Sequence, residues 1–364
     1  MKRFFFSTIL RGGLAALITL GSLGATGYAQ VITTFDPPNS IYTVPQAINP
    51  FGQITGYYQD ANGFPTHSFL RQPDGTFTTF EVQQTDGSWS TFATDIDLFG
   101  QITGYFIRPF LTRSFLRQID GTIVLFDGFP SSDATQPAAT EPAPNPDCPV
   151  DGTLALAING EGQIAGSYVP GAFCRGFLRQ PDGTTTDFEV LPQSENLIPT
   201  TVPQGLNLLG QITGYFRDDN GFRGFLRKPS GRIVRFDPPN STRTTPRAIN
   251  LWGQITGHYQ DANSVVHAFL RRPSGAIITF DPSGSINTQA TAINLKGQIT
   301  GYYATADGTY HGFLRRQNGN IETFDVPGAG LGGTFPKGIN AFGQITGYYQ
   351  DANFVLHGFV RSAH

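Results

Sequence analysis

Charged residues are scarce in this chain of 364 residues, and their scarcity narrows the classes of protein to which it can belong. Asp, Glu, Lys and Arg make up 14% of the sequence, the formal net charge is −3, and no block of basic residues occurs. This argues against a nucleic acid as partner, because phosphate backbones are bound by clustered Lys and Arg. Nucleophile-elbow, His-Glu-x-x-His and glycine-rich phosphate-loop motifs are also missing, so no local motif indicates catalysis.

Cysteine is almost absent, since the chain contains only Cys148 and Cys174. Two thiolates without neighbouring histidines supply too few ligands for a zinc site. In an oxidising compartment two thiols separated by a short loop usually pair. We therefore expect a disulfide between Cys148 and Cys174, with two free thiols as the alternative.

Long apolar segments are missing after residue 30, and the residues before it have the pattern of a secretory signal peptide. Residues 1–29 carry basic residues, then an uncharged stretch over 14–23, then a small-x-small site, Gly27-Tyr28-Ala29. An uncleaved anchor is the alternative, although the stretch is shorter than the ~20 residues of a membrane-spanning helix. We expect cleavage after residue 29 and a single domain over 30–364 that is secreted, periplasmic or on the cell surface and is not inserted in a membrane.

The sequence is rich in one repeated segment, Gly-Gln-Ile-Thr-Gly or a close variant. Its copies begin at Gly52, Gly100, Gly162, Gly210, Gly253, Gly297 and Gly343. A period of roughly 40–50 residues is typical of architectures in which each unit buries its apolar face against the next. The third repeat carries an insertion over 128–152, rich in Pro and Ala, which is either a solvated loop or a lid.

Each repeat contains the signals of two hairpins. An Asn or Asp stands three residues before the repeated segment, as in Asn49, which favours a type I turn that ends at Gly. A Phe-Leu-Arg triplet follows, and eleven residues after its Phe comes a second Phe followed by an acidic residue. Turns such as Pro73-Asp74-Gly75 lie between the two and predict a three-residue hairpin loop. The sequence therefore predicts four short antiparallel strands per repeat.

The register of the second hairpin places a cation opposite an acid in every complete repeat. The predicted pairs are His67 with Glu81, Arg113 with Asp127, Arg175 with Glu189, Arg223 with Asp237, His267 with Asp281, and His311 with Asp325. Three of these positions are Arg, which is neither a base nor a metal ligand at ordinary pH. The shared role that we predict is charge pairing across the hairpin.

The chain begins and ends in the middle of a repeat. Residues 34–36 form a fourth strand with no third strand before it, and residues 357–361 form a third strand with no fourth after it. Pairing of the two would close a ring and bring His357 to Asp36. The predicted fold is an all-β, seven-bladed β-propeller of four-stranded antiparallel blades. An open solenoid or stacked sandwich, the alternative, would leave two raw strand edges.

The repeats resemble a known family. His267-Ala268-Phe269, together with Ala-Ile-Asn followed by Gly-Gln-Ile-Thr-Gly, is similar to the pattern of the HAF-repeat family of extracellular bacterial repeat proteins. The resemblance extends over essentially all of residues 30–364. It implies export and a repeated β-fold, and it brings no catalytic residues to carry over.

The connections that vary in length share one face of the predicted disc, and we expect binding there. Trp89 is the candidate for stacking on a sugar, with packing against its own blade as the alternative. Asp95 stands where the other innermost strands have Ala or Gly, so we expect it to line the central channel. Asp218 and Asp219 form the strongest candidate for calcium among several Asp- and Asn-rich loops, although turn chemistry explains these loops without a metal.

We therefore predict a non-catalytic, monomeric binding scaffold that needs no cofactor. Its expected partner is a glycan, a cell-wall component or a protein. The alternative is a propeller hydrolase or lyase that acts on polysaccharide and uses carboxylates such as Asp95.

Overall fold

The computed structural model describes residues 30–84, 87–108, 111–128, 152–169, 174–192 and 199–363. Within these ranges the protein is all β, with antiparallel sheets and no helix. The described residues accordingly offer no helix that could cross a membrane. The predicted signal peptide, Cys148 and nearly all of the predicted insertion fall outside the described residues.

Each repeat forms a sheet of four antiparallel strands that follow one another along the chain. The first consists of β2 (Ser40–Ile48), β3 (Ile54–Asp60), β4 (His67–Arg71) and β5 (Phe77–Phe80). In its second hairpin Ser68 pairs with Phe80 and Arg71 with Phe77, which is the register that the turn sequence predicts. The left-handed Gly75, with φ of 94°, ends that turn.

The next repeats keep this order. The second and third consist of β7 (Gly87–Ile96), β8 (Ile102–Arg108), β9 (Leu111–Arg117), β10 (Ile123–Phe126), β11 (Gly152–Ile158), β12 (Ile164–Val169), β13 (Arg175–Arg179) and β14 (Thr185–Phe188). The fourth and fifth consist of β15 (Thr201–Leu206), β16 (Ile212–Asp218), β17 (Gly221–Arg227), β18 (Ile233–Phe236), β19 (Ser241–Ile249), β20 (Ile255–Asp261), β21 (Val266–Arg271) and β22 (Ile277–Phe280). The sixth consists of β23 (Asn287–Ile293), β24 (Ile299–Ala304), β25 (Tyr310–Arg315) and β26 (Ile321–Phe324). A short extra strand, β6 (Val82–Gln84), pairs with β7.

The last sheet contains strands from both ends of the chain. It consists of β27 (Gly333–Ile339), β28 (Ile345–Gln350), β29 (Leu356–Arg361) and the early strand β1 (Ile32–Phe35). β1 runs antiparallel to β29, with Ile32 opposite Arg361 and Phe35 opposite Gly358. The fourth strand of this sheet therefore comes from the start of the sequence.

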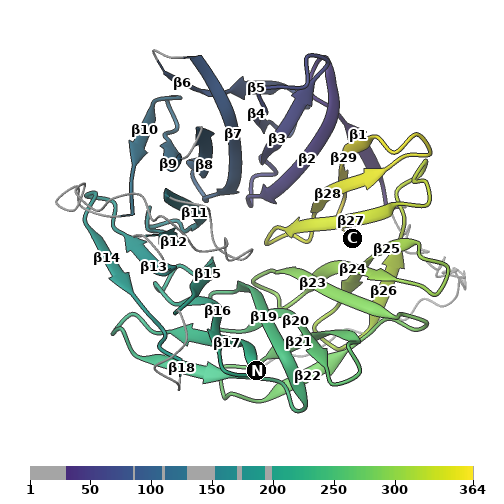
Figure 1. Ribbon diagram of the computed structural model, residues 1–364. Helices are drawn as coiled ribbons and strands as arrows, with labels where there is room; N and C mark the ends of the chain where they lie inside the picture. Colours follow the sequence, from purple (N-terminus) through teal and green to yellow (C-terminus); the bar gives the residue numbers. More distant parts are fainter. Residues whose placement is uncertain are drawn as a thin grey trace, which may run out of the picture.

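The sheets lie side by side around a common centre, with the first strand of each sheet innermost (Figure 1). The innermost strands contact one another in the order β2, β7, β11, β15, β19, β23 and β27, and β27 in turn contacts β2. A single parallel bridge from Gly152 to Thr112 links the second sheet to the third. A second bridge, from Val266 to Asn287, links the fifth sheet to the sixth.

The core lies within and between the sheets. The Phe of the Phe-Leu-Arg triplet is fully buried wherever it occurs, for example at Phe69 and Phe115. The Arg of the triplet stacks on a Phe of the preceding sheet, as Arg71 does on Phe35 at 4.7 Å. Each sheet therefore completes its neighbour's burial through aromatic and cation–π contacts.

The second Gly of the repeated segment is required by the close approach of two strands. A Cβ atom on Gly56 would lie 2.2 Å from the carbonyl oxygen of Val44, at the irregular pairing between Pro45 and Ala47. A side chain cannot be accommodated at that distance, so only Gly fits.

Candidate functional site

The turn between the first two strands of each sheet is fixed by its Asn. In the first turn, Asn49 Oδ1 accepts hydrogen bonds from the backbone N–H groups of Phe51 and Gln53, both at 3.0 Å. Its Nδ2 donates to Gln53 Oε1 at 2.7 Å and to the carbonyl oxygen of Asp97, in the next turn, at 3.2 Å. One buried amide therefore holds its own turn and the neighbouring turn together.

The same donation links most of the neighbouring turns. Nδ2 donates to the carbonyl of the next turn from Asn159 to Asn207, Asn207 to Asn250, Asn250 to Asn294, Asn294 to Asn340, and Asn340 to Asn49, over 2.9 to 3.1 Å. The turns therefore gather on one face of the molecule, which we call the turn face. It comprises residues 49–52, 97–100, 159–162, 207–210, 250–253, 294–297 and 340–343.

The turn face carries large apolar side chains in contact with solvent. The residue just before the turn Gly is 58 to 66% exposed where it is apolar, at Phe51, Phe99, Leu209, Trp252 and Phe342. This position of a type I turn points away from the sheet, so no core packing explains the choice of residue. A group of exposed apolar side chains on one face is typical of a binding surface.

A pocket of about 400 Å³ lies on this face between the fifth and sixth repeats. Trp252 Nε1 donates to the carbonyl oxygen of Leu295 at 2.9 Å, which fixes the indole across the boundary between the two turns. Lys296 Nζ lies 3.5 Å from the carbonyl oxygen of Phe342. The lining consists of Trp252, Gln254, Pro273, Leu295, Lys296 and Gln317. The pocket thus combines an aromatic ring, two side-chain amides and one ammonium group.

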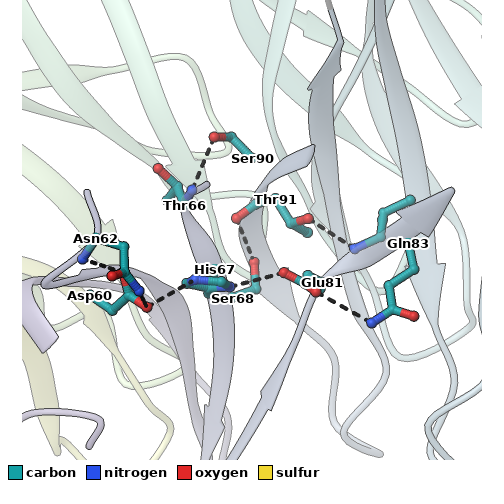
Figure 2. A network of polar contacts seen from close by, with 10 residues as sticks. Asp60, Asn62, Thr66, His67, Ser68, Glu81, Gln83, Ser90 and Thr91 are labelled. Carbon is teal, nitrogen blue, oxygen red and sulfur yellow. Dashed lines mark hydrogen bonds and ion pairs between the residues drawn. The ribbon is translucent and has the colours of Figure 1, made fainter. Parts of the chain in front are cut away.

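The histidines of the second hairpin lie between two carboxylates. In the first repeat, His67 Nδ1 is 3.1 Å from Glu81 Oε2 and its Nε2 is 3.8 Å from Asp60 Oδ2, as Figure 2 shows. The ring also lies 5.2 Å from that of Tyr58. This arrangement holds three strands of one sheet together, and its contacts are those of a structural charge pair.

The corresponding contacts recur in other repeats. The distances are 2.9 Å for Arg113 with Asp127, 4.0 Å for Arg175 with Glu189, 2.7 Å for His267 with Asp281, 3.0 Å for His311 with Asp325, and 2.7 Å for His357 with Asp36. Arg175 lies closer to Asp187, at 3.0 Å, than to its predicted partner.

The prediction for Arg223 needs correction. Its Nε lies 3.2 Å from Asp218 Oδ2, and its Nη1 donates to the carbonyl oxygen of Ser241 at 3.0 Å. The predicted partner Asp237 instead accepts a hydrogen bond from the backbone N–H of Gly224 at 3.4 Å. The tight β16–β17 hairpin, with Asp218 opposite Gly221, brings the nearer carboxylate to the guanidinium.

Asp95 lies on the innermost strand β7, but its oxygens are occupied by backbone groups. Oδ1 accepts from the N–H of Ile96 at 2.9 Å, and Oδ2 accepts from the N–H of Ile158 in the third repeat at 3.0 Å. Burial raises its pKa from 3.8 to about 7. The side chain therefore bridges two sheets, a role that the sequence did not predict because Ile158 belongs to another repeat.

The remaining predicted site residues are not brought together. Trp89 lies on β7 opposite Val82, and its side chain is outside the described part of the structure. Asp219 is exposed in the β16–β17 turn, and Asp218 is engaged by Arg223. Among the described residues no group of three or more His, Cys, Asp or Glu side chains could hold a metal ion. Cys174 is buried, and its pairing with Cys148 stays a prediction because Cys148 is not described.

The sequence matches no protein-family model and no curated protein. Similar solved structures include a fucose-specific lectin from Aleuria aurantia, at 13% identity over 90% of this chain and 97% of that one, with a TM-score of 0.42. TolB from Acinetobacter baumannii is similar at 10% identity over 92% and 80%, with a TM-score of 0.44. Dipeptidyl peptidase 4 of Porphyromonas gingivalis is similar at 11% identity over 86% and 50%, with a TM-score of 0.46.

Proposed function

We propose that the protein is an exported, non-catalytic glycan-binding scaffold, built as a closed seven-bladed β-propeller of the HAF-repeat type. The cyclic order of contacts among the innermost strands and the pairing of β1 with β29 support the closed ring. The signal-like residues 1–29 support export.

The Trp252 pocket is the observation that carries the glycan proposal. A pyranose ring presents a face of C–H groups that packs on an aromatic ring, and its rim of hydroxyls pairs with amides and ammonium groups. The pocket offers both kinds of contact, because the indole of Trp252 adjoins Gln254, Gln317 and Lys296. The hydrogen bond from the indole to Leu295 holds the platform in place before a ligand arrives, which lowers the entropic cost of binding.

A glycan array with the full chain tests the proposal, followed by calorimetry on the best ligand. We expect Trp252→Ala to weaken binding more than tenfold, because a central aromatic contact commonly contributes most of the affinity. Phe51→Ala is the matched control, since it removes an equally exposed aromatic residue from the same position of another turn, and it should bind like the wild type.

Two results would overturn the proposal. One is the absence of any glycan ligand at millimolar concentration. The other is equal binding by wild type and Trp252→Ala. Release of new reducing ends from a bound polysaccharide would show hydrolysis and would reject the non-catalytic part.

A further inference from the structure

One position of the innermost strand is occupied by residues of different charge from repeat to repeat. It directly precedes Ala47 in β2, and its copies are Gln46, Thr94, Leu156, Gln204, Arg247, Thr291 and Lys337. Two of these residues are cations and none is an acid.

The two cations stand at the same position of two innermost strands. Arg247 is on β19 and Lys337 on β27, and β23 stands between these strands in the contact order. Burial and then the charge of Arg247 lower the pKa of Lys337 to about 8. Side chains at this position reach the neighbouring innermost strand, because Thr291 Oγ1 on β23 donates to the carbonyl oxygen of Pro336, next to Lys337, at 3.1 Å.

Neither cation has an acidic partner within the described residues. Arg247 Nη1 donates to the neutral amide oxygen Gln204 Oε1 at 2.9 Å, and Lys337 Nζ lies 5.4 Å from the centre of the Tyr348 ring. Arg247 is exposed, so its guanidinium remains accessible to a ligand. Like charges held close together destabilise the folded chain, and an anion bound between them would relieve that repulsion.

Neutral polar groups lie on β20 and β24, strands that contact β19 and β27. The hydroxyl of Tyr302 donates to Gln289 Oε1 at 2.8 Å, and burial raises the pKa of this Tyr. His258 Nδ1 is buried without a hydrogen-bond partner in the described part of the chain. Burial, followed by the charges of Arg247 and Arg243, lowers the pKa of His258 to about 3. The imidazole is therefore neutral near pH 7 and can donate one N–H.

We propose that Arg247 and Lys337 form a binding site for a carboxylate at the centre of the ring of innermost strands. A guanidinium binds a carboxylate through two parallel hydrogen bonds, and an ammonium adds a point charge. The ligand class is a small carboxylic acid, either a free organic acid or the uronic acid of a glycan. The site shares no residue with the Trp252 pocket, so either proposal can fail without the other.

Calorimetry and thermal unfolding of the full chain test the site, with sodium glucuronate as probe, glucose as its neutral counterpart, and constant ionic strength. We expect glucuronate to bind and glucose not to bind at this site. Arg247→Gln and Lys337→Gln should each weaken glucuronate binding at least tenfold. Arg232→Gln is the matched control, because it removes one positive charge from an exposed turn, and it should bind like the wild type.

Two further measurements complete the test. Acetate binding distinguishes a free organic acid from an acidic sugar, and melting temperatures without ligand identify variants that fail to fold. Acetate that binds as tightly as glucuronate would assign the site to free organic acids, whereas a preference for glucuronate would assign it to acidic sugars. Without ligand, Arg247→Gln and Lys337→Gln should melt at or above the wild-type temperature, because repulsion is relieved. Lower melting temperatures combined with unchanged glucuronate affinity would overturn the proposal, as would failure of both carboxylates to bind the wild type.

Discussion

The turns that contain Asn207 and Asp97 have the same hydrogen bonds within the turn, but only Asn207 donates a hydrogen bond to the next sheet. Both side chains are buried, and in both Oδ1 accepts from two N–H groups of its own turn. Asn207 also donates to the carbonyl of Asn250 at 2.9 Å. Asp97 has no amide to donate, and its buried Oδ2 has no partner among the described residues.

A second carboxylate bridges the boundary where the amide is missing. Asp95, two residues before Asp97, accepts the N–H of Ile158 from the third repeat. Most boundaries between turns are thus bridged by an amide that donates to a carbonyl, whereas this one is bridged by a carboxylate that accepts from an N–H. Because the repeats share their backbone geometry, the difference between the two boundaries comes from the side chains of Asp95 and Asp97.

The largest expected difference is in the pH dependence of stability. Burial raises the pKa of Asp95 from 3.8 to about 7, so folding favours its protonated form. Its contribution to stability is complete below about pH 4 and is lost as the pH rises to about 7, up to about 4 kcal/mol in the free energy of unfolding. Denaturant unfolding at several pH values should show wild type losing this stability relative to Asp95→Ala. Parallel curves for the two proteins would contradict the pKa assignment.

The next largest effect is expected from removal of the side-chain amide of Asn207, which links the fourth repeat to the fifth. Asn207→Ala leaves the N–H groups of Leu209 and Gln211 and the carbonyl of Asn250 without their buried partner. We expect a loss of about 3 kcal/mol in the free energy of unfolding, measured with denaturant. Asn207→Asp, which copies the second repeat, keeps the two accepted hydrogen bonds and should lose less. Equal losses would mean that the donated hydrogen bond contributes nothing.

The smallest effect is expected from placing an amide at the boundary between the second and third repeats, where Asp97 replaces the Asn of the other turns. Asp97→Asn supplies a donor toward the carbonyl of Asn159, and it removes a carboxyl whose pKa is raised by burial. We expect a gain of about 1 kcal/mol at pH 7, seen as a higher denaturation midpoint, that shrinks as the pH falls and the wild-type carboxyl becomes protonated. A loss of stability at pH 7 would show that Asp97 has a favourable partner of its own.

Local features of the fold follow directly from the sequence. The Pro-Asp-Gly turn fixes the number of residues between facing strands, so the pairing of Ser68 with Phe80 could be counted without a structure. The Asn that starts the first turn was recognisable for the same reason, because its side chain bonds within four residues.

Contacts that the hairpin register leaves open, within a repeat or between repeats, could not be predicted in this way. The sequence places two acids, Asp218 and Asp237, within reach of Arg223. The tight β16–β17 hairpin brings Asp218 closer, and Arg223 pairs with it. The Trp252 pocket exists because the next turn approaches from another repeat. A signal for the turn face was nevertheless present, since aromatic residues recur at a turn position that always points to solvent.

The pairing of β1 with β29 also constrains the time course of folding. Residues 32–35 pair only with residues 358–361, so β1 stays unpaired until those residues have been synthesised. A chain that stops before Leu356 would leave β1 without its neighbour and expose the edge of β28 to pairing with other molecules. Loss of residues 356–361 should therefore promote aggregation more strongly than an equally large loss from an exposed turn.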